Sequence, residues 1–191
     1  MHKNRTQESA NFADLPKIFK LNNELASIEI SRYGGQLISY IPKNQKDLFW
    51  LSNQISPPPA AIRGGVPICW PWFGAHPTDG SFCPHGFARV IPWRINEIID
   101  LESGATKVTF VMLPTPEVNR QLSYQFNLEF SITIGSSIHL DLKTTNLSEQ
   151  PFLIGEGYHT YFEISDIENI EVTGLENKIY SDKAKGYKKF T

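Results

Sequence analysis

The amino-acid sequence predicts a mostly β protein, built as an antiparallel β-sandwich. Short runs rich in β-branched and aromatic residues recur along the 191-residue chain, as the strands of such a fold require. Several runs alternate apolar and polar residues at period two, and in the run 137–146 the apolar positions are Ile138, Leu140 and Leu142. The sequence contains no long amphipathic helix, which argues against a doubly wound α/β enzyme.

The predicted elements follow one another from residue 18 onward. Gly34 and Gly35 supply a turn between two strands, and residues 102–105 supply another. Short helical turns are expected near residues 116–120 and 166–168. The predicted strands cover residues 18–21, 26–30, 36–41, 93–99, 107–113, 125–134 and 137–146.

Length and charge limit the organisation and the partners of the chain. Residues 1–15 are polar and are expected to form a flexible N-terminus, while residues 16–191 are expected to form one sandwich domain. The net charge of −2 favours neither nucleic acid nor a membrane as a partner. The apolar runs are too short for a spanning helix, and the polar start lacks the apolar core of a signal peptide. We therefore expect a cytoplasmic protein.

The two cysteines, Cys69 and Cys83, are too few for a disulfide scaffold. Free thiols are expected, with a single disulfide as the alternative. Together with His76 and His85 they suggest a zinc site, but the successive spacings of seven, seven and two residues lack the ligand pairs of structural zinc sites. We expect no metal ion. Serine-nucleophile signatures, Walker loops and dinucleotide-binding glycine patterns are also absent from the sequence.

Three segments combine ionisable groups with aromatic residues, glycine or both: 61–74, 84–89 and 158–162. Their shared composition predicts that they form one pocket. In the first segment Arg63 is followed by two glycines, so the backbone can approach a ligand closely while the guanidinium offers a planar fork of donors. A second arginine, Arg89, favours a two-cation clamp for a phosphate or carboxylate, with surface ion pairs as the structural alternative.

His85 and His159 have aromatic rather than charged near neighbours. A neutral imidazole donates at one nitrogen and accepts at the other, so one histidine could hydrogen-bond a sugar hydroxyl while the other transfers a proton. The structural alternative is a pair of core histidines. Aromatic residues in the same segments could stack on the apolar face of a pyranose ring, but the sequence assigns none of them individually.

The residues 62–67, 71–74, 85–89 and 159–162 closely resemble the corresponding motifs of the hexose-6-phosphate 1-epimerases. These enzymes belong to the aldose 1-epimerase (mutarotase) superfamily. The resemblance extends from about residue 16 to the end of the chain and includes residues 47–52. It implies a galactose-mutarotase-like β-supersandwich and an isomerase that interconverts the α and β anomers of glucose 6-phosphate or a similar aldose phosphate.

The resemblance also implies roles for four residues. His159 corresponds to the general acid, His85 to the second pocket histidine, and Arg63 and Arg89 to the arginines that contact the phosphate. Protonating the ring oxygen while a base removes the anomeric hydroxyl proton would open the ring, and the aldehyde could rotate and reclose on its other face. Neither a metal ion nor a cofactor is needed. Two arginines suit a dianionic phosphate better than a neutral hexose.

One part of the resemblance is missing. The family's general base is a glutamate on a strand near the C-terminus, preceded by a sugar-binding aspartate, and the sequence ends at Thr191 with neither segment in evidence. We therefore expect a C-terminally truncated sandwich whose open edge a homo-oligomer could cover. Two functions stay open. One is a slow epimerase whose base is water, Glu156 or another subunit; the other is a non-catalytic sugar-phosphate binder or degraded paralogue. The sequence could also be a fragment of a longer chain.

Overall fold

The computed structural model describes residues 18–54, 58–113 and 115–191. The N-terminus that we expect to be flexible, residues 1–15, lies outside these ranges.

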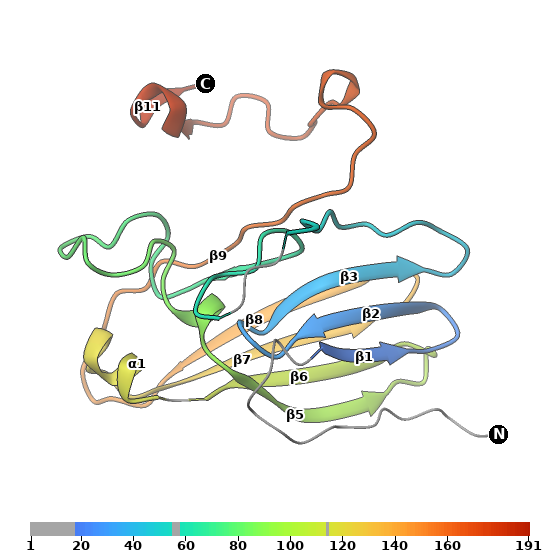
Figure 1. Ribbon diagram of the computed structural model, residues 1–191, viewed down its shortest axis with the longest axis horizontal. Coiled ribbons are helices and arrows are strands. Elements are labelled where there is room, and N and C mark those ends of the chain that lie inside the picture. The colour runs from blue at the N-terminus through green and yellow to red at the C-terminus, as the bar shows by residue number, and fades with distance from the viewer. Residues whose placement is uncertain (1–17, 55–57, 114) are drawn as a thin grey trace.

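Two antiparallel sheets form the body of the protein (Figure 1). The first sheet has the order β1-β2-β3 and the second the order β5-β6-β7-β8. Their strands are β1 (Ile18–Asn22), β2 (Ala26–Ser31), β3 (Gln36–Pro42), β5 (Trp93–Asp100), β6 (Thr106–Met112), β7 (Phe126–Ile134) and β8 (Ile138–Asn146). Each coincides with one predicted strand, so the predicted mostly β, antiparallel fold is confirmed.

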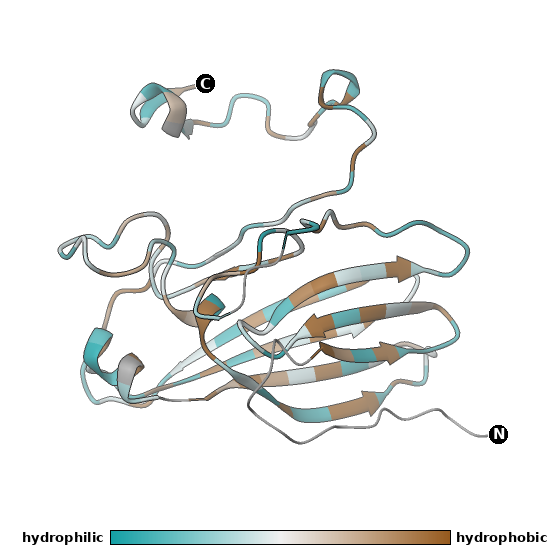
Figure 2. Ribbon diagram, in the orientation of Figure 1, coloured by the Kyte–Doolittle hydropathy of each residue, from teal (hydrophilic) through white to brown (hydrophobic). Residues whose placement is uncertain are grey.

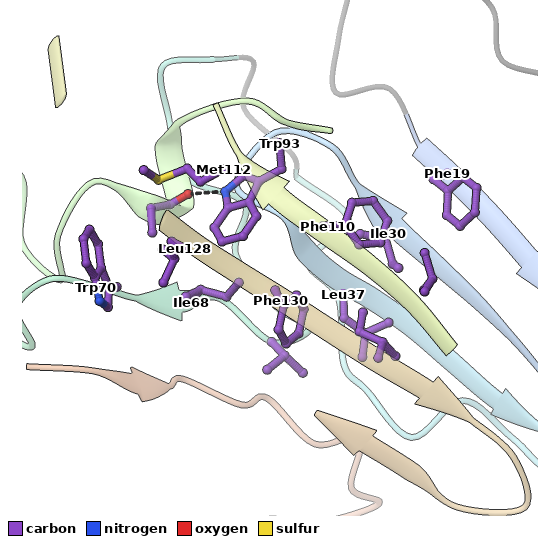
Figure 3. Packing of buried hydrophobic residues seen from close by; sticks show 14 of the residues in the cluster. Phe19, Ile30, Leu37, Ile68, Trp70, Trp93, Phe110, Met112, Leu128 and Phe130 are labelled. Atoms are coloured by element: carbon purple, nitrogen blue, oxygen red, sulfur yellow. Dashed lines mark hydrogen bonds between the residues drawn. The ribbon is translucent and has the colours of Figure 1, made fainter. Parts of the chain in front are cut away.

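The core lies between these two sheets (Figure 3). Because successive strand residues point to opposite faces, period-two alternation buries one side of each strand. Ile28 and Ile30 of β2 are buried in this way, and Phe19 of β1 meets Phe110 of β6 with ring centroids 5.7 Å apart. Figure 2 shows the same alternation as hydrophobic and hydrophilic bands along the strands. Burial of these large side chains holds the two sheets face to face.

The remaining elements are short. Both predicted helical turns are present, as α1 (Pro116–Gln121) and the 3-10 helix η2 (Ile167–Asn169). Thr115 caps α1, since its hydroxyl accepts from the amide of Val118. The sequence did not predict η1 (Ala88–Val90), η3 (Lys183–Lys185), β4 (Ile68–Cys69), β9 (Gly157–Tyr158), β10 (Tyr180–Asp182) or β11 (Lys188–Phe190). Within the described ranges no helix combines the length and apolarity needed to span a bilayer.

Residues 163–191 leave the body of the sandwich and carry the hairpin β10-β11 (Figure 1). Nearly all of the side chains described in this segment are exposed. The sheets and the segments that contain the candidate residues therefore lie within residues 18–162. That residues 16–191 form a single domain stays a prediction.

Candidate functional site

Pairing of β4 with β9 joins two of the three segments singled out in the sequence. Ile68 lies opposite Tyr158, and Cys69 lies opposite Gly157. The pairing continues beyond the strands, because the His159 amide donates to the Pro67 carbonyl at 3.0 Å. His159 therefore lies directly beside the segment that contains Arg63.

The third segment joins through the turn at His85. Gly86 forms a parallel bridge with Trp70, and the His85 amide donates to the Gly74 carbonyl at 2.6 Å. The Gly74 amide in turn donates to Nδ1 of His85 at 3.3 Å. A nitrogen that accepts a hydrogen bond carries no proton, so the proton of a neutral His85 ring sits on Nε2. This tautomer makes Nε2 of His85 a donor.

The two histidines and one aromatic ring meet where the segments converge. The rings of His85 and His159 are perpendicular, with centroids 5.6 Å apart. Phe73 lies 4.9 Å from the His85 ring and parallel to the His159 ring at 6.5 Å. Phe73 is 58% exposed, although such a ring is normally buried. The cluster is therefore an open surface that offers two imidazoles beside an apolar ring face.

A line of ring contacts leads from His159 to Arg63. Tyr161 stacks on His159 at 4.9 Å, and Trp50 lies 5.9 Å from Tyr161. The guanidinium carbon of Arg63 lies over the Trp50 ring, 5.8 Å from its centroid. Arg63 is itself exposed, whereas the residues on either side of it are buried. The site thus has an imidazole end and a cationic end, connected by aromatic rings.

Arg89 joins the site by a different route from the one predicted. It is half-buried, and its Nη2 donates to the Pro84 carbonyl at 2.8 Å and lies 4.0 Å from Sγ of Cys83. Pro84 immediately precedes His85. Arg89 therefore stabilises the His85 turn through the Pro84 carbonyl, and its positive charge lies close to that turn.

The residues considered for zinc do not converge on a metal site. No group of three or more histidine, cysteine, aspartate or glutamate side chains among the described residues has the geometry to hold a metal ion. Nδ1 of His76 instead accepts from the amides of Thr78 and Asp79. Both cysteines are free thiols; burial raises the pKa of Cys69, and the Arg89 charge partly offsets that rise.

Glu156 immediately precedes β9 and is exposed. Burial and, to a smaller extent, the charges of Asp141 and Glu156 raise the pKa of Tyr158 to about 12. The negative charge of Glu156 therefore acts on the Tyr158 hydroxyl. A Cβ on Gly157 would lie 3.4 Å from the Phe73 ring, which belongs to the histidine cluster. The charge of Glu156 thus acts on Tyr158, whereas Gly157 faces the histidine cluster.

The buried position of Tyr158 allows the packing of β9 to be tested by mutation. Its hydroxyl is buried and has no hydrogen-bond partner in the described part of the chain. Replacing Tyr158 with phenylalanine is expected to raise the free energy of unfolding at pH 7 by about 1 kcal/mol, because it removes an unpaired polar group. Urea denaturation measures the change.

The pH dependence gives an independent readout. A folded-state pKa above the usual tyrosine value of 10 means that the native protein keeps the proton to higher pH than the unfolded chain does. The ionisation of Tyr158 therefore leaves the free energy of unfolding unchanged below pH 10 and lowers it as the pH rises toward 12. Tyr158→Phe should remove that loss, and identical pH profiles for the two proteins would contradict the buried position.

A hollow of about 770 Å³ lies between α1 and the residues around η1. It contains none of the four residues predicted from the sequence. Its lining comprises Pro59, Ser81, Phe82, Cys83, Phe87, Val90, Ile91, Pro92, Thr115, Pro116, Arg120 and Gln121. Cys83 connects this hollow to the back of the His85 turn. His85, His159 and Phe73 of the histidine cluster do not line this hollow.

Sequence reasoning did not assign Trp50, Phe73 or Tyr161 to the site. Aromatic residues of a sandwich usually belong to its core, so residue type alone gave no reason to choose these three. A usable signal was their position, since Phe73 and Tyr161 each lie within a segment that also carries a candidate histidine or arginine.

Comparison with known proteins identifies the family of this chain. The family described as aldose 1-epimerase matches residues 17–188. A protein of Cenchrus ciliaris, provisionally named glucose-6-phosphate 1-epimerase, is 39% identical over 172 residues, covering 85% of this chain and 51% of its own length. A protein of Escherichia coli K12 with the same provisional name is 34% identical over 143 residues, covering 74% of this chain and 47% of its own length. The chain spans about half the length of these relatives.

Solved structures show the same fold. A Salmonella typhimurium protein provisionally named a mutarotase matches with a TM-score of 0.82 at 27% identity, covering 92% of this chain and 57% of its own. A galactose mutarotase related enzyme from Lactobacillus acidophilus matches with a TM-score of 0.63 at 16% identity, which supports the fold alone. It covers 81% of this chain and 52% of its own. The fold is therefore galactose-mutarotase-like, and the chain belongs to the aldose 1-epimerase family.

Proposed function

We propose that this chain binds a hexose 6-phosphate and interconverts its α and β anomers, as a hexose-6-phosphate 1-epimerase. The observation that carries the proposal is the pair of imidazoles connected through aromatic rings to the exposed Arg63. This surface offers proton-transfer groups at one end and a cation at the other. Glucose 6-phosphate carries the two groups that this surface could recognise, a proton-exchanging anomeric centre on C1 and an anionic phosphate on C6. The provisional names of the plant and bacterial relatives support the same substrate class.

His159 is the proposed general acid. It donates a proton to the ring oxygen while the anomeric hydroxyl loses its proton, so the bond from the anomeric carbon to the ring oxygen breaks and an aldehyde forms. Rotation about the adjacent carbon–carbon bond presents the other aldehyde face, and the reverse proton transfers close the ring. No net proton, electron or atom is gained or lost. The Phe73 and Tyr161 rings, parallel to His159, limit the orientation of its imidazole.

His85 is the proposed second sugar contact. Its Nδ1 accepts from the backbone, so a neutral His85 presents Nε2–H to a sugar oxygen. A donor held in one tautomer orients the anomeric end without competing for the transferred proton. Phe73, beside both histidines, offers its exposed face to the apolar side of the sugar ring.

Water is the proposed proton acceptor in this chain. Glu156, whose charge acts on Tyr158, is not assigned this role. Water is a weaker base than a positioned carboxylate, so catalysis should be slower than with one, by about 100-fold or more. The alternative function, non-catalytic sugar-phosphate binding, would leave binding intact without exchange.

Arg63 gives the sharpest test of the substrate class. Arg63→Ala is expected to weaken glucose 6-phosphate binding by about 10- to 100-fold, because it removes charge-assisted hydrogen bonds to the phosphate. Glucose, which has no phosphate, should bind the variant and the wild type equally well. Isothermal titration calorimetry measures both ligands.

Arg94→Ala is the matched control, because Arg94 is exposed on β5 and contacts Asn96 rather than the site. It should leave the affinity for both sugars unchanged. Equal wild-type affinity for glucose and glucose 6-phosphate would remove Arg63 as the phosphate ligand. That Arg89 is a second phosphate cation stays a prediction; its contact with the Pro84 carbonyl places it at the His85 turn, at the imidazole end of the site.

Two further assignments stay predictions. One is a cytoplasmic location, and the other is a homo-oligomeric state. Size-exclusion chromatography with light scattering measures the oligomeric state.

A further inference from the structure

Gln36 contacts the backbone on both sides of Arg63. It is the first residue of β3 and is fully buried. Its Nε2 donates to the Ile62 carbonyl at 3.3 Å and to the Gly64 carbonyl at 2.6 Å. Both contacts are to carbonyl oxygens, so this amide nitrogen can only be the donor. One buried side chain thus holds the carbonyl groups of the two residues that flank the exposed arginine.

The neighbouring backbone leaves the Arg63 loop little room to compensate for a change at Gln36. The Gly65 amide donates to the Trp50 carbonyl, and the Val66 amide donates to the Leu37 carbonyl, both at 2.8 Å. Gly65 has a positive φ of 59°, and a Cβ there would lie 2.2 Å from the Leu37 oxygen. The loop therefore packs directly on β3, and this close packing restricts the conformation of its backbone.

The oxygen of the Gln36 amide, in contrast to its nitrogen, makes no hydrogen bond within the described residues. This oxygen, Oε1, is buried. A buried acceptor without a donor costs free energy, which an apolar side chain of the same size would avoid. The two donated hydrogen bonds are thus what a glutamine supplies here and an isosteric apolar residue would not.

We infer that Gln36 is a positioning residue that sets the Arg63 guanidinium for phosphate recognition. The inference rests on the proposed function of Arg63. Charge-assisted hydrogen bonds to a phosphate depend on geometry, so a displacement of the loop weakens them. A displacement of about 1 Å can cost about 100-fold in a positioned interaction. Gln36 touches no ligand and acts through the Ile62 and Gly64 carbonyls.

The test compares Gln36→Met with Tyr40→Phe. Methionine approximates the volume of glutamine but has no donor, so both carbonyls lose their partner. Tyr40 is the matched control: it lies on β3, is 2% exposed, and donates from its hydroxyl to the Gly135 carbonyl at 3.0 Å. Gln36→Met removes two buried hydrogen bonds to the Arg63 loop. Tyr40→Phe removes one buried hydrogen bond from the same strand, but its partner, Gly135, lies outside that loop.

Calorimetry with glucose 6-phosphate and with glucose gives the primary readout. Gln36→Met is expected to weaken glucose 6-phosphate binding by about tenfold and to leave glucose binding within about twofold. Tyr40→Phe should leave both affinities unchanged. An undiminished preference of Gln36→Met for the phosphate would overturn the inference, and so would an equal loss for both ligands. If Gln36→Met does not fold, Gln36→Asn keeps the donors but shortens their reach, and the same loss of preference is expected.

Backbone amide exchange separates this inference from the proposed function. The amides of Gly65 and Val66 should exchange faster in Gln36→Met than in wild type, and Tyr40→Phe should leave them unchanged. Unchanged exchange would overturn the positioning role even if Arg63 binds phosphate. If wild type binds glucose and glucose 6-phosphate equally, the phosphate role of Arg63 fails and the inference fails with it. Faster exchange in Gln36→Met would then still show that Gln36 holds the loop.

Discussion

Replacing His159 with alanine is expected to lower the protein-dependent anomer exchange of glucose 6-phosphate by about 100- to 10,000-fold, the usual contribution of a positioned general acid. The reason is its place in the site. Its ring stacks on Tyr161, lies parallel to Phe73 and meets His85 at a right angle. NMR magnetisation transfer between the two anomers measures the exchange rate.

A matched control distinguishes the role of His159 from a general effect of losing an imidazole. His139 lies on the exposed face of β8, so His139→Ala should leave the exchange rate unchanged. His159→Ala should still bind glucose 6-phosphate, because Arg63 and His85 remain. Exchange that survives His159→Ala would exclude His159 as the acid.

Replacing Gly86 with alanine is expected to lower the free energy of unfolding by about 4 kcal/mol, since overpacking and backbone strain act together. A Cβ at residue 86 would lie 2.0 Å from the carbonyl oxygen of Trp70, and Gly86 has a positive φ of 74°. Trp70 is itself fully buried and packs on Phe87 and Phe126. The backbone there cannot retreat without opening the core.

Urea denaturation of Gly86→Ala and Gly80→Ala tests this close approach. Gly80 lies in the same region of the chain, and a Cβ there would meet nothing within 4 Å. Gly80→Ala should therefore change the stability by no more than about 0.5 kcal/mol. If the two variants have equal stability, the His85 turn does not pack on Trp70 as described, and the geometry of the histidine cluster must be revised.

The strands were predictable because their signal is local. In β8, for instance, alternation among neighbouring residues shows which side faces the core. Strands β4 and β9 were missed because each has two residues, too few for a period to appear. Their pairing joins Ile68 to Tyr158, which are far apart in the sequence. Which loops meet is set by such long-range pairing.

In the candidate site, too, local sequence identified some residues, while long-range backbone pairing determines how they are connected. His85 and His159 could be chosen from residue type and neighbours, and the structure brings their rings together. The route from His159 to Arg63 through Tyr161 and Trp50 depends on backbone pairing that no local pattern encodes. The contact of Arg89 with the Pro84 carbonyl was likewise not predicted. A side chain that reaches back five residues depends on the course of the turn between them.

The most direct test of the proposed function is anomer exchange of glucose 6-phosphate in the presence of the wild-type chain. Magnetisation transfer compares the exchange rate with protein, without protein, and with protein when glucose replaces glucose 6-phosphate. We expect protein-dependent exchange that is faster for glucose 6-phosphate than for glucose, because the cluster of His85 and His159 supplies the proton transfer and Arg63 holds the phosphate. An exchange rate equal to that of buffer alone would contradict the epimerase function.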